Sequence, residues 1–340
     1  MRKTGKLWPL LLLAAVAMQP MQAQETSEVR QPDIHGTVRG KYEYQPENGT
    51  GRFEVRNALF SLSGKVTPYT AYKAEIDISD EGSIKMRDAY VSFTPVKPFQ
   101  FTIGLMRVPF TIDAHRSPHL QYFANRSFIA KQVGNVRDVG AKVGYRFNGE
   151  VPVQLEAGLY NGSGQTAQKD YWTKQLNFST KAQVFLPQGF CLTLGVQKVH
   201  PATVSVYLYD AGVYYHSYHW HIEAEYLRKH YAHGAFGAVN AFDGFINYDH
   251  HLRKGMFRKV SFLARYDFMG DHNDGKLDEE GRLKLTDCKR HRLTGGVTLS
   301  LAKPFISDIR INYENYFYRR NAVAKVSEQD KIVIEFMTRF

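Results

Sequence analysis

Alternating apolar and charged residues recur along almost the whole chain, in segments joined by links of two very different lengths. The last ten residues show the pattern most simply, with apolar side chains on one face of an extended strand and charged ones on the other: Ile332, Ile334, Phe336 and Phe340 against Lys331, Glu335 and Arg339. This period of two predicts sixteen strands, at residues 34–44, 52–64, 69–79, 84–94, 99–106, 137–147, 152–160, 174–186, 190–198, 204–215, 217–228, 239–251, 257–270, 289–302, 305–318 and 331–340.

The polar faces of these segments often carry charges of both signs. Five segments carry polar or charged residues on one face, and three of them mix both signs: Lys73, Glu75 and Asp77; Lys142 and Arg146; His221, Glu223 and Glu225; Arg265 and Asp267; Arg310, Asn312 and Glu314. A strand in a soluble core rarely keeps such a face unless water reaches it. The pattern therefore indicates a sheet with one apolar face and one wet face. Residues 52–64 fit it poorly, and we predict a β-bulge near Asn57.

The links between the segments are sorted by length. Tight links follow the even-numbered strands, around residues 66–68, 96–98, 148–150, 187–189, 253–255 and 303–304, whereas several odd-numbered strands are followed by long links: 107–136, 161–173, 229–238, 271–288 and 319–330. Transmembrane β-barrels have short turns at one end and long loops at the other, and a soluble sandwich has no reason to sort its links in this way. The sequence predicts an all-β fold, a transmembrane antiparallel up-and-down barrel of about sixteen strands.

Residues 1–23 have the parts of a secretory signal peptide. Three cations precede the short apolar stretch 10–17, and Met21-Gln22-Ala23 supplies a cleavage site. Residues 24–340 are then a single barrel domain in the outer membrane of a Gram-negative type of cell, in contact with outer-membrane lipid and lipopolysaccharide. The chain has a net charge of +11, but export argues against a nucleic-acid partner. Cys191 follows a tight link and Cys288 a long one, at opposite barrel ends, so we expect both to be free.

The link at residues 107–136 is too long for an ordinary hairpin, and loops beyond about 15 residues are usually functional or disordered. It carries apolar residues that favour burial and, with the residue that follows it, several cations: Phe110, Ile112, Leu120, Tyr122, Phe123, Phe128 and Ile129, with Arg107, Arg116, Arg126, Lys131 and Arg137. We predict that it folds into the barrel lumen, where cations at a constriction attract anions. The alternative is a loop over the barrel mouth whose arginines pair with acids such as Glu75 or Asp88.

Four short motifs resemble the phosphate-selective porin O and P family: residues 88–91 (DAYV), 104–110 (GLMRVPF), 123–127 (FANRS) and 137–140 (RDVG). They also follow one another in the family's order. The resemblance implies an outer-membrane channel, a homotrimer, in which loop and wall cations line the path of a small anion, with phosphate as the favoured solute. By motif it assigns Arg107, Arg126 and Arg137 to that path.

To these constriction candidates we add Lys131, and as weaker candidates on the lumen wall Lys73, Lys142 and Arg265. The best-known members of the family select phosphate with a ladder of arginines and lysines and a lysine cluster, and we find no match to those positions here. The lumen faces instead mix cations with acids. Two alternatives stay open: a general-diffusion porin for small neutral solutes, and a plugged barrel that binds a ligand or anchors an assembly.

Other clusters are interpreted as structural. His219 and His221 share a strand face but lack a tetrahedral ligand set, so we place them in the lumen beside an aromatic girdle and predict no metal site. The acids of residues 271–280 lack the register of an EF-hand loop. The group Asp113, His115, Ser117 and His119 has no GxSxG motif around its serine. We therefore expect no enzyme activity and no cofactor.

Overall fold

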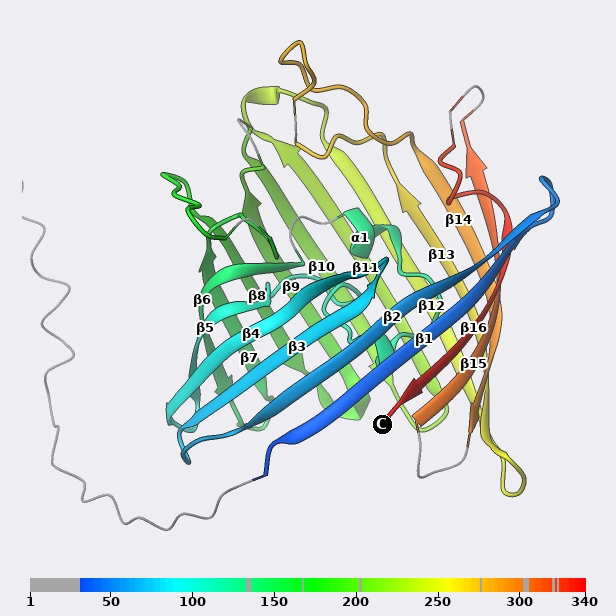
Figure 1. Cartoon of the computed structure of the whole chain (residues 1–340), viewed down its shortest axis with the longest axis horizontal. Helices are drawn as coiled ribbons and strands as arrows, with labels where there is room; N and C mark the ends of the chain where they lie inside the picture. Colours follow the sequence, from blue (N-terminus) through cyan, green and yellow to red (C-terminus); the bar gives the residue numbers. More distant parts are fainter. Residues whose placement is uncertain are drawn as a thin grey trace, which may run out of the picture. The chain divides into compact units, whose positions relative to one another are not determined.

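The computed structural model describes residues 31–132, 136–166, 168–201, 204–275, 277–301, 306–319, 322 and 324–340. Within these ranges sixteen antiparallel strands form a closed barrel, in which sequence neighbours pair and β1 (Asp33–Gln45) closes onto β16 (Lys331–Arg339) (Figure 1). The strands between them are β2 (Thr50–Lys65), β3 (Thr70–Asp80), β4 (Ser83–Val96), β5 (Phe99–Arg107), β6 (Arg137–Phe147), β7 (Val153–Tyr160), β8 (Asn177–Phe185), β9 (Phe190–Val199), β10 (Val206–His216), β11 (Trp220–Tyr231), β12 (Val239–His251), β13 (Phe257–Met269), β14 (Arg290–Leu301) and β15 (Ile306–Tyr318). The predicted fold class is confirmed.

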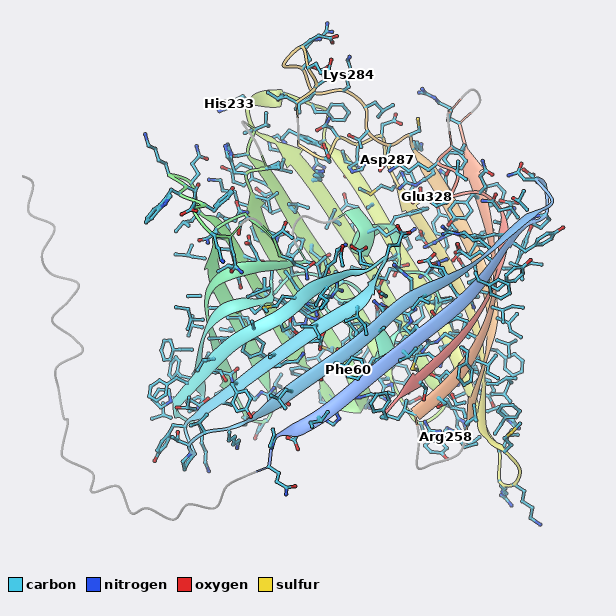
Figure 2. The ribbon with its side chains drawn as sticks, in the orientation of Figure 1. Phe60, His233, Arg258, Lys284, Asp287 and Glu328 are labelled. Carbon is cyan, nitrogen blue, oxygen red and sulfur yellow. The ribbon has the colours of Figure 1, made fainter. Side chains whose placement is uncertain are left out.

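The strands turn their apolar side chains outward and most of their charged ones into the lumen. In β16, Ile334 and Phe336 are exposed on the outside, whereas Lys331 and Glu335 are buried inside. Phe60 of β2 belongs to the same outer surface (Figure 2). An apolar outer band over a polar interior is the arrangement that lipid outside and water inside require.

The two barrel ends differ in their links. Figure 2 shows Arg258 at the end with tight links, the short-turn end, and Lys284, Asp287 and Glu328 at the opposite, long-loop end. The tight link before β9 depends on Gly189, which has φ +89° and whose added Cβ would come within 2.1 Å of the His216 carbonyl oxygen.

Three sequence predictions concern segments near these ends. Cys191, just after a tight link, and Cys288, in a long one, are free thiols as predicted. The predicted signal peptide, residues 1–23, and the tight link 303–304 lie outside the described residues. No helix in the part of the chain that the structure describes is both long and apolar enough to cross a membrane.

Two of the β-bulges in the described barrel ladder lie where β1 meets β2 and where β3 meets β4. Where β1 meets β2, Arg39 pairs with Asn57 but Gly40 pairs with Val55, so Arg56 is an extra residue. This confirms the bulge predicted near Asn57. Where β3 meets β4, Glu75 pairs with Asp88 but Ile76 pairs with Met86, so Arg87 is a second extra residue. A bulge interrupts the strict alternation, and two consecutive residues can then face the same side.

The described residues of the segment 108–136, which we call the inner loop, fold into the lumen as predicted and contain η1 (Pro118–Leu120) and α1 (Phe128–Gln132). Phe128 and Ile129 are fully buried in a core cluster with Leu208, Leu227 and Met269 of three different strands. α1 contacts β12 and β13 and lies within the ring of strands in Figure 1. The apolar residues that made this segment unlike a solvated loop are therefore its anchors.

Candidate functional site: a cationic gap beside the inner loop

Hydrogen bonds fasten the first part of the inner loop to the strands β8–β16, which we call the packed wall. The carbonyl oxygen of Pro109 accepts a bond from Ser179 Oγ at 2.7 Å, and that of Thr111 accepts one from Lys181 Nζ at 2.6 Å. The next backbone N–H along the loop donates to Glu225 of β11. Three successive contacts thus leave this backbone little freedom to move.

The later part of the loop is fastened to other strands of the packed wall. The backbone N–H of Ala124 donates to Asn312 Oδ1 at 2.9 Å. Arg265 donates to the carbonyl oxygen of Asn125 at 3.0 Å, and Arg292 donates to the carbonyl oxygen of the next residue at 2.8 Å. Asn312 lies at the middle of β15, whereas Arg292 is the third residue of β14, so this part of the loop runs from mid-height toward the long-loop end.

Glycines in the packed wall make room for the loop's apolar side chains. A Cβ at Gly212 would lie 2.6 Å from Ile112 Cδ1, and one at Gly195 would lie 3.0 Å from the Phe110 ring. The first distance is shorter than real Cβ contacts and the second is tighter than most of them, so a larger residue at either position would require the loop side chain to shift.

The buried arginines of the packed wall are paired with carboxylates. Arg292 donates to Asp267 Oδ2 at 2.9 and 3.1 Å, and neither side chain is exposed. Glu335 accepts from Arg310 at 2.5 Å on one oxygen and from Arg39 at 2.5 and 2.9 Å on the other. Such pairs neutralise one another and leave little field for a passing solute.

Strands β2–β6 form the open wall, and two polar cavities of about 320 and 220 Å³ lie between it and the inner loop. Cations dominate their linings: Arg87 and Arg126 line both cavities, Arg137 lines the larger, and Arg39, Arg56 and Lys85 line the smaller, together with the acids Asp77 and Asp80. We call these two cavities the cationic gap.

The two bulges supply the wall arginines of the cationic gap. Arg87 lines the gap although Asp88, next to it in sequence, also faces inward and pairs with Arg137. The Nε atom of Arg87 is buried and has no hydrogen-bond partner among the described residues. Arg56 lies 3.9 Å from its closest carboxylate oxygen, on Glu54. A buried donor without a partner calls for an explanation, and an anion or water in the gap provides one.

Arg107 and Arg126 bind the loop to itself through backbone carbonyls. Arg107 Nη1 donates to the carbonyl oxygens of His115 at 2.8 Å and Arg116 at 3.0 Å. Arg126 donates to the carbonyl oxygens of Asp113 and, at 2.7 Å, Arg116. Carbonyls carry no net charge, so these bonds leave both guanidinium charges in place. Burial lowers the pKa of Arg126 to about 10, and the group is still protonated at neutral pH.

The other predicted cations are held by carboxylates: Arg137 by Asp88 at 2.7 Å and Glu75 at 3.4 Å, Lys73 by Asp88 at 2.7 Å and Glu75 at 2.8 Å, Lys142 by Glu156 at 2.6 Å, Arg265 by Asp267 at 3.0 Å and Lys131 by Glu328 at 3.5 Å. Of the residues predicted from sequence, only Arg126 and Arg137 line the cationic gap. The pairing of Arg137 with Glu75 and Asp88 is the one that the alternative interpretation expected, although the loop lies inside the barrel.

Sequence reasoning missed Arg56 and Arg87. In a strand with strict alternation, a residue next to an inward-facing side chain points outward, so neither arginine was expected in the lumen. A usable signal was nevertheless present at Arg87-Asp88, since two adjacent charges in one strand would put one of them against lipid. A bulge at Arg87 removes that conflict, because both side chains can then face the lumen. The irregular pattern around Asn57 had already suggested the bulge at Arg56.

The catalytic and calcium-binding alternatives find other partners. Asp113 accepts hydrogen bonds from Ser127 and Arg116, and His119 contacts Arg339. Asp278 is occupied by the backbone N–H groups of Glu280 and Arg282.

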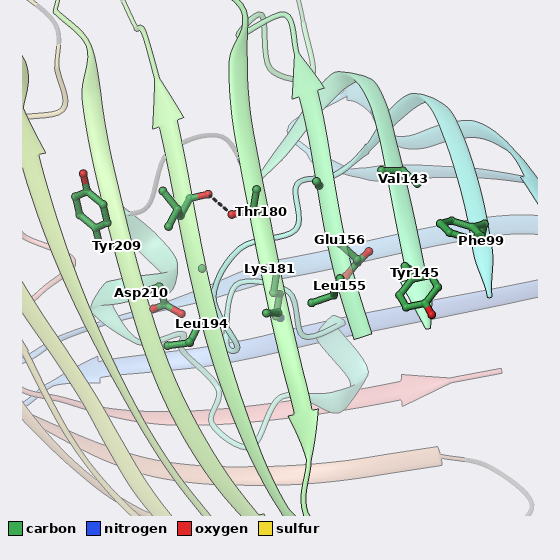
Figure 3. Close-up of a pocket in the computed structure, with 14 residues that line it drawn as sticks. Phe99, Val143, Tyr145, Leu155, Glu156, Thr180, Lys181, Leu194, Tyr209 and Asp210 are labelled. Carbon is green, nitrogen blue, oxygen red and sulfur yellow. Dashed lines mark hydrogen bonds between the residues drawn. The ribbon is translucent and has the colours of Figure 1, made fainter. Parts of the chain in front are cut away.

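Two larger hollows, of about 580 and 640 Å³, lie on the outer face of the barrel over β4–β10. Figure 3 shows the first of them, bordered by Phe99, Tyr145, Leu155, Leu194 and Tyr209. Its lining is almost wholly apolar and faces away from the lumen. These hollows therefore belong to the lipid-facing surface and not to a solute path.

Comparison with known proteins identifies a family and several structures that resemble this barrel. The family model described as phosphate-selective porin O and P matches residues 33–205, about half of the chain, from β1 through β9. That range contains the four motifs, both bulges and most of the cationic gap. No curated protein matches.

Several solved outer-membrane structures share the fold. The channel DcaP of Acinetobacter baumannii is 12% identical, with 91% of this chain and 96% of that chain covered and a TM-score of 0.62. An anion-selective porin from Comamonas acidovorans is 10% identical, with coverage of 91% and 98% and a TM-score of 0.62. OmpT of Vibrio cholerae, in its trimer form, is 10% identical, with coverage of 91% and 98% and a TM-score of 0.59. At these identities the likeness establishes the fold.

Proposed function

The chain belongs to the phosphate-selective porin O and P family and forms an outer-membrane channel, and from that premise we propose that small anions diffuse passively through its cationic gap. Phosphate is the favoured solute. The observation that carries this proposal is the concentration of arginines between the inner loop and the open wall, where Arg87 has a buried donor without a partner among the described residues.

The geometry gives an anion a reason to take this route. The buried arginines of the packed wall are already paired with carboxylates. In the gap, Arg87 Nε has no hydrogen-bond partner among the described residues, Arg56 is 3.9 Å from Glu54, and Arg126 donates to backbone carbonyls. A narrow lumen with low-dielectric walls focuses the field of such charges and raises the local concentration of anions. Of the predicted path residues, Arg126 and Arg137 act in the gap directly. Arg107 supports it by shaping the loop.

The same premise extends to export and assembly. Residues 1–23 are removed as a signal peptide in this proposal, and residues 24–340 enter the outer membrane as one domain beside lipid and lipopolysaccharide. A homotrimer is the proposed assembly, in keeping with the trimer form of the structurally similar OmpT.

The proposal is tested by the reversal potential of single channels in a KCl gradient, using refolded protein in a planar bilayer. The wild type is expected to prefer chloride over potassium, and added phosphate is expected to reduce the chloride current. The double variant Arg56→Glu with Arg87→Glu should lower the anion preference several-fold, because it replaces two cations of the gap with anions. The inner loop should stay in place, since neither side chain is among those that hold it. Lys142→Gln is the matched control, since Lys142 is a lumen cation outside the gap that Glu156 already neutralises.

Three other outcomes would contradict the proposed anion path. Conducting channels whose permeability ratio is the same in the double variant and the wild type would refute the anion path. A folded wild type that does not conduct would identify a plugged barrel. Conductance without ion preference would identify the second candidate, a general-diffusion porin for small neutral solutes, which is favoured by the acids Asp77 and Asp80 in the gap. Swelling of liposomes in neutral sugars measures that activity directly.

A further inference from the structure

Two histidines converge at the short-turn end of the lumen, away from the cationic gap. His216 ends β10 and His221 follows the start of β11, and the two are directly opposite each other in the ladder. Their Nδ1 atoms are 3.3 Å apart, with ring centroids 5.5 Å apart and ring planes 59° apart. The two nitrogens are within hydrogen-bonding distance, so one nitrogen of each ring faces the other.

A carboxylate fixes which nitrogen of His221 is free to bind. Glu223 Oε2 lies 3.0 Å from His221 Nε2, and a carboxylate can only accept there, so Nε2 carries the proton. His221 Nδ1 then has a lone pair directed toward His216. Histidines that ligate metals almost always donate their other ring N–H to a carboxylate, a carbonyl or water, and this contact sets their tautomer and orientation.

The separation of the two nitrogens matches a metal chelate. Zinc–imidazole bonds of about 2.0–2.1 Å at tetrahedral angles place two ligand nitrogens about 3.3 Å apart. We propose that His216 and His221 bind one borderline divalent transition-metal ion, such as Zn²⁺, through their Nδ1 atoms, with water completing the coordination. The site does not depend on which solute passes through the barrel.

The surroundings suit a neutral two-ligand site open to water. His216 is exposed, whereas His221 is buried against the lumen. The nearby carboxylates already have partners, because Glu223 Oε2 also pairs with Arg116 at 2.5 Å and Asp249 pairs with Lys259 at 2.8 Å, whereas Glu223 Oε1 has no hydrogen-bond partner among the described residues. Among the residues the structure describes, no group of three or more His, Cys, Asp or Glu side chains could hold a metal, so the chelate is limited to these two imidazoles.

The pair that the structure brings together, His216 and His221, differs from the pair His219 and His221 that strand alternation suggested. His219 Nδ1 lies 2.9 Å from the carbonyl oxygen of Asp249, and its ring stacks on Tyr248 rather than meeting His221. The partner of His221 comes instead from the preceding strand, across the turn. His219 is thus a close neighbour of the site without being a ligand, which makes it the natural control.

The inner loop also contacts this site. Tyr122 stacks on the His221 ring with centroids 4.6 Å apart and planes 17° apart, and Arg116 lies 5.1 Å over the Tyr122 ring. An ion that fixes the His221 ring therefore also fixes the surface on which the tip of the loop rests.

The test is a titration of the refolded barrel in detergent with Zn²⁺ alone, followed by isothermal calorimetry at pH 7.5. We expect one Zn²⁺ per chain at this site, and His216→Gln and His221→Gln should each weaken its binding at least tenfold. His219→Gln should bind as the wild type does. Binding should also weaken as the pH falls below about 6.5, where imidazole protonates. A circular-dichroism spectrum with unchanged β content shows that each variant is folded.

Two results would overturn the proposal. One is a wild-type barrel that takes up no Zn²⁺ at micromolar protein and metal. The other is equal binding by all three variants, which would place the ion on other surface histidines. Because the readout is binding, it is independent of whether the channel prefers anions.

Discussion

The two walls of the lumen use arginine in opposite ways. On the packed wall, Arg292 and Arg310 are buried and bound to carboxylates of neighbouring strands. On the open wall, Arg56 and Arg87 stand at bulges and face a cavity. The packed wall therefore uses its charges to hold the inner loop in place, and the open wall keeps its charges available to a solute.

The difference follows from where the inner loop rests. Burial of a charge is tolerated when a partner is supplied, and the packed wall supplies one for each arginine that the loop covers. The loop covers the open wall less closely, so arginines there can stay hydrated or meet an anion. Function is thus concentrated on the side of the barrel where the packing is weaker.

The sharpest way to break this comparison is to delete one residue from each wall. Removal of Arg87 takes out only the extra residue, so Met86 and Asp88 become neighbours and β4 regains regular alternation. We expect that chain to fold and to lose part of its anion preference. Removal of Arg292, the third residue of the regular strand β14, puts the residues on its two sides on conflicting faces and leaves Asp267 and Glu314 without this partner, so we expect a much lower yield of folded barrel. Refolding yield, followed by electrophoretic mobility with and without heating, measures both, and equal yields would refute the distinction.

A smaller effect is expected from removing one carboxylate from each wall. Asp267→Asn leaves Arg292 and Arg265 without their closest counter-charge in a site closed to water. The free energy of unfolding should fall by about 3–5 kcal/mol, the usual cost of breaking a buried pair. Asp80→Asn on the open wall is the matched change, because Asp80 and Lys85 are nearly half exposed. It should cost no more than about 1 kcal/mol. Guanidinium unfolding of both variants in the same lipid provides the comparison.

The smallest expected effect is that of salt concentration on the anion preference. Charges that face water are screened, and the Debye length falls from about 10 Å at 0.1 M to about 3 Å at 1 M ionic strength. The anion preference of the open wall should therefore shrink when the same KCl concentration ratio is applied at higher absolute concentrations. A preference that does not change with salt would mean that pore shape, and not the arginines of the gap, sets it.

The sequence by itself determined the barrel. Alternation such as that of residues 331–340 allows only a sheet with one apolar and one wet face, and the sorted links fix how its strands connect. The apolar residues of the inner loop, Phe128 and Ile129 among them, were enough to place that loop inside. These are local patterns, and each strand satisfies them without reference to distant parts of the chain.

Tertiary structure alone decided which charges are free. Arg137 and Arg126 look alike in sequence, yet one meets Asp88 across the barrel wall and the other meets only backbone carbonyls. Likewise, the bulge at Arg87 depends on the register between β3 and β4, and the partner of His221 depends on the fold of the turn before it. A side chain's partner is set by residues far away in sequence, because the energy of a charge depends on what surrounds it in space.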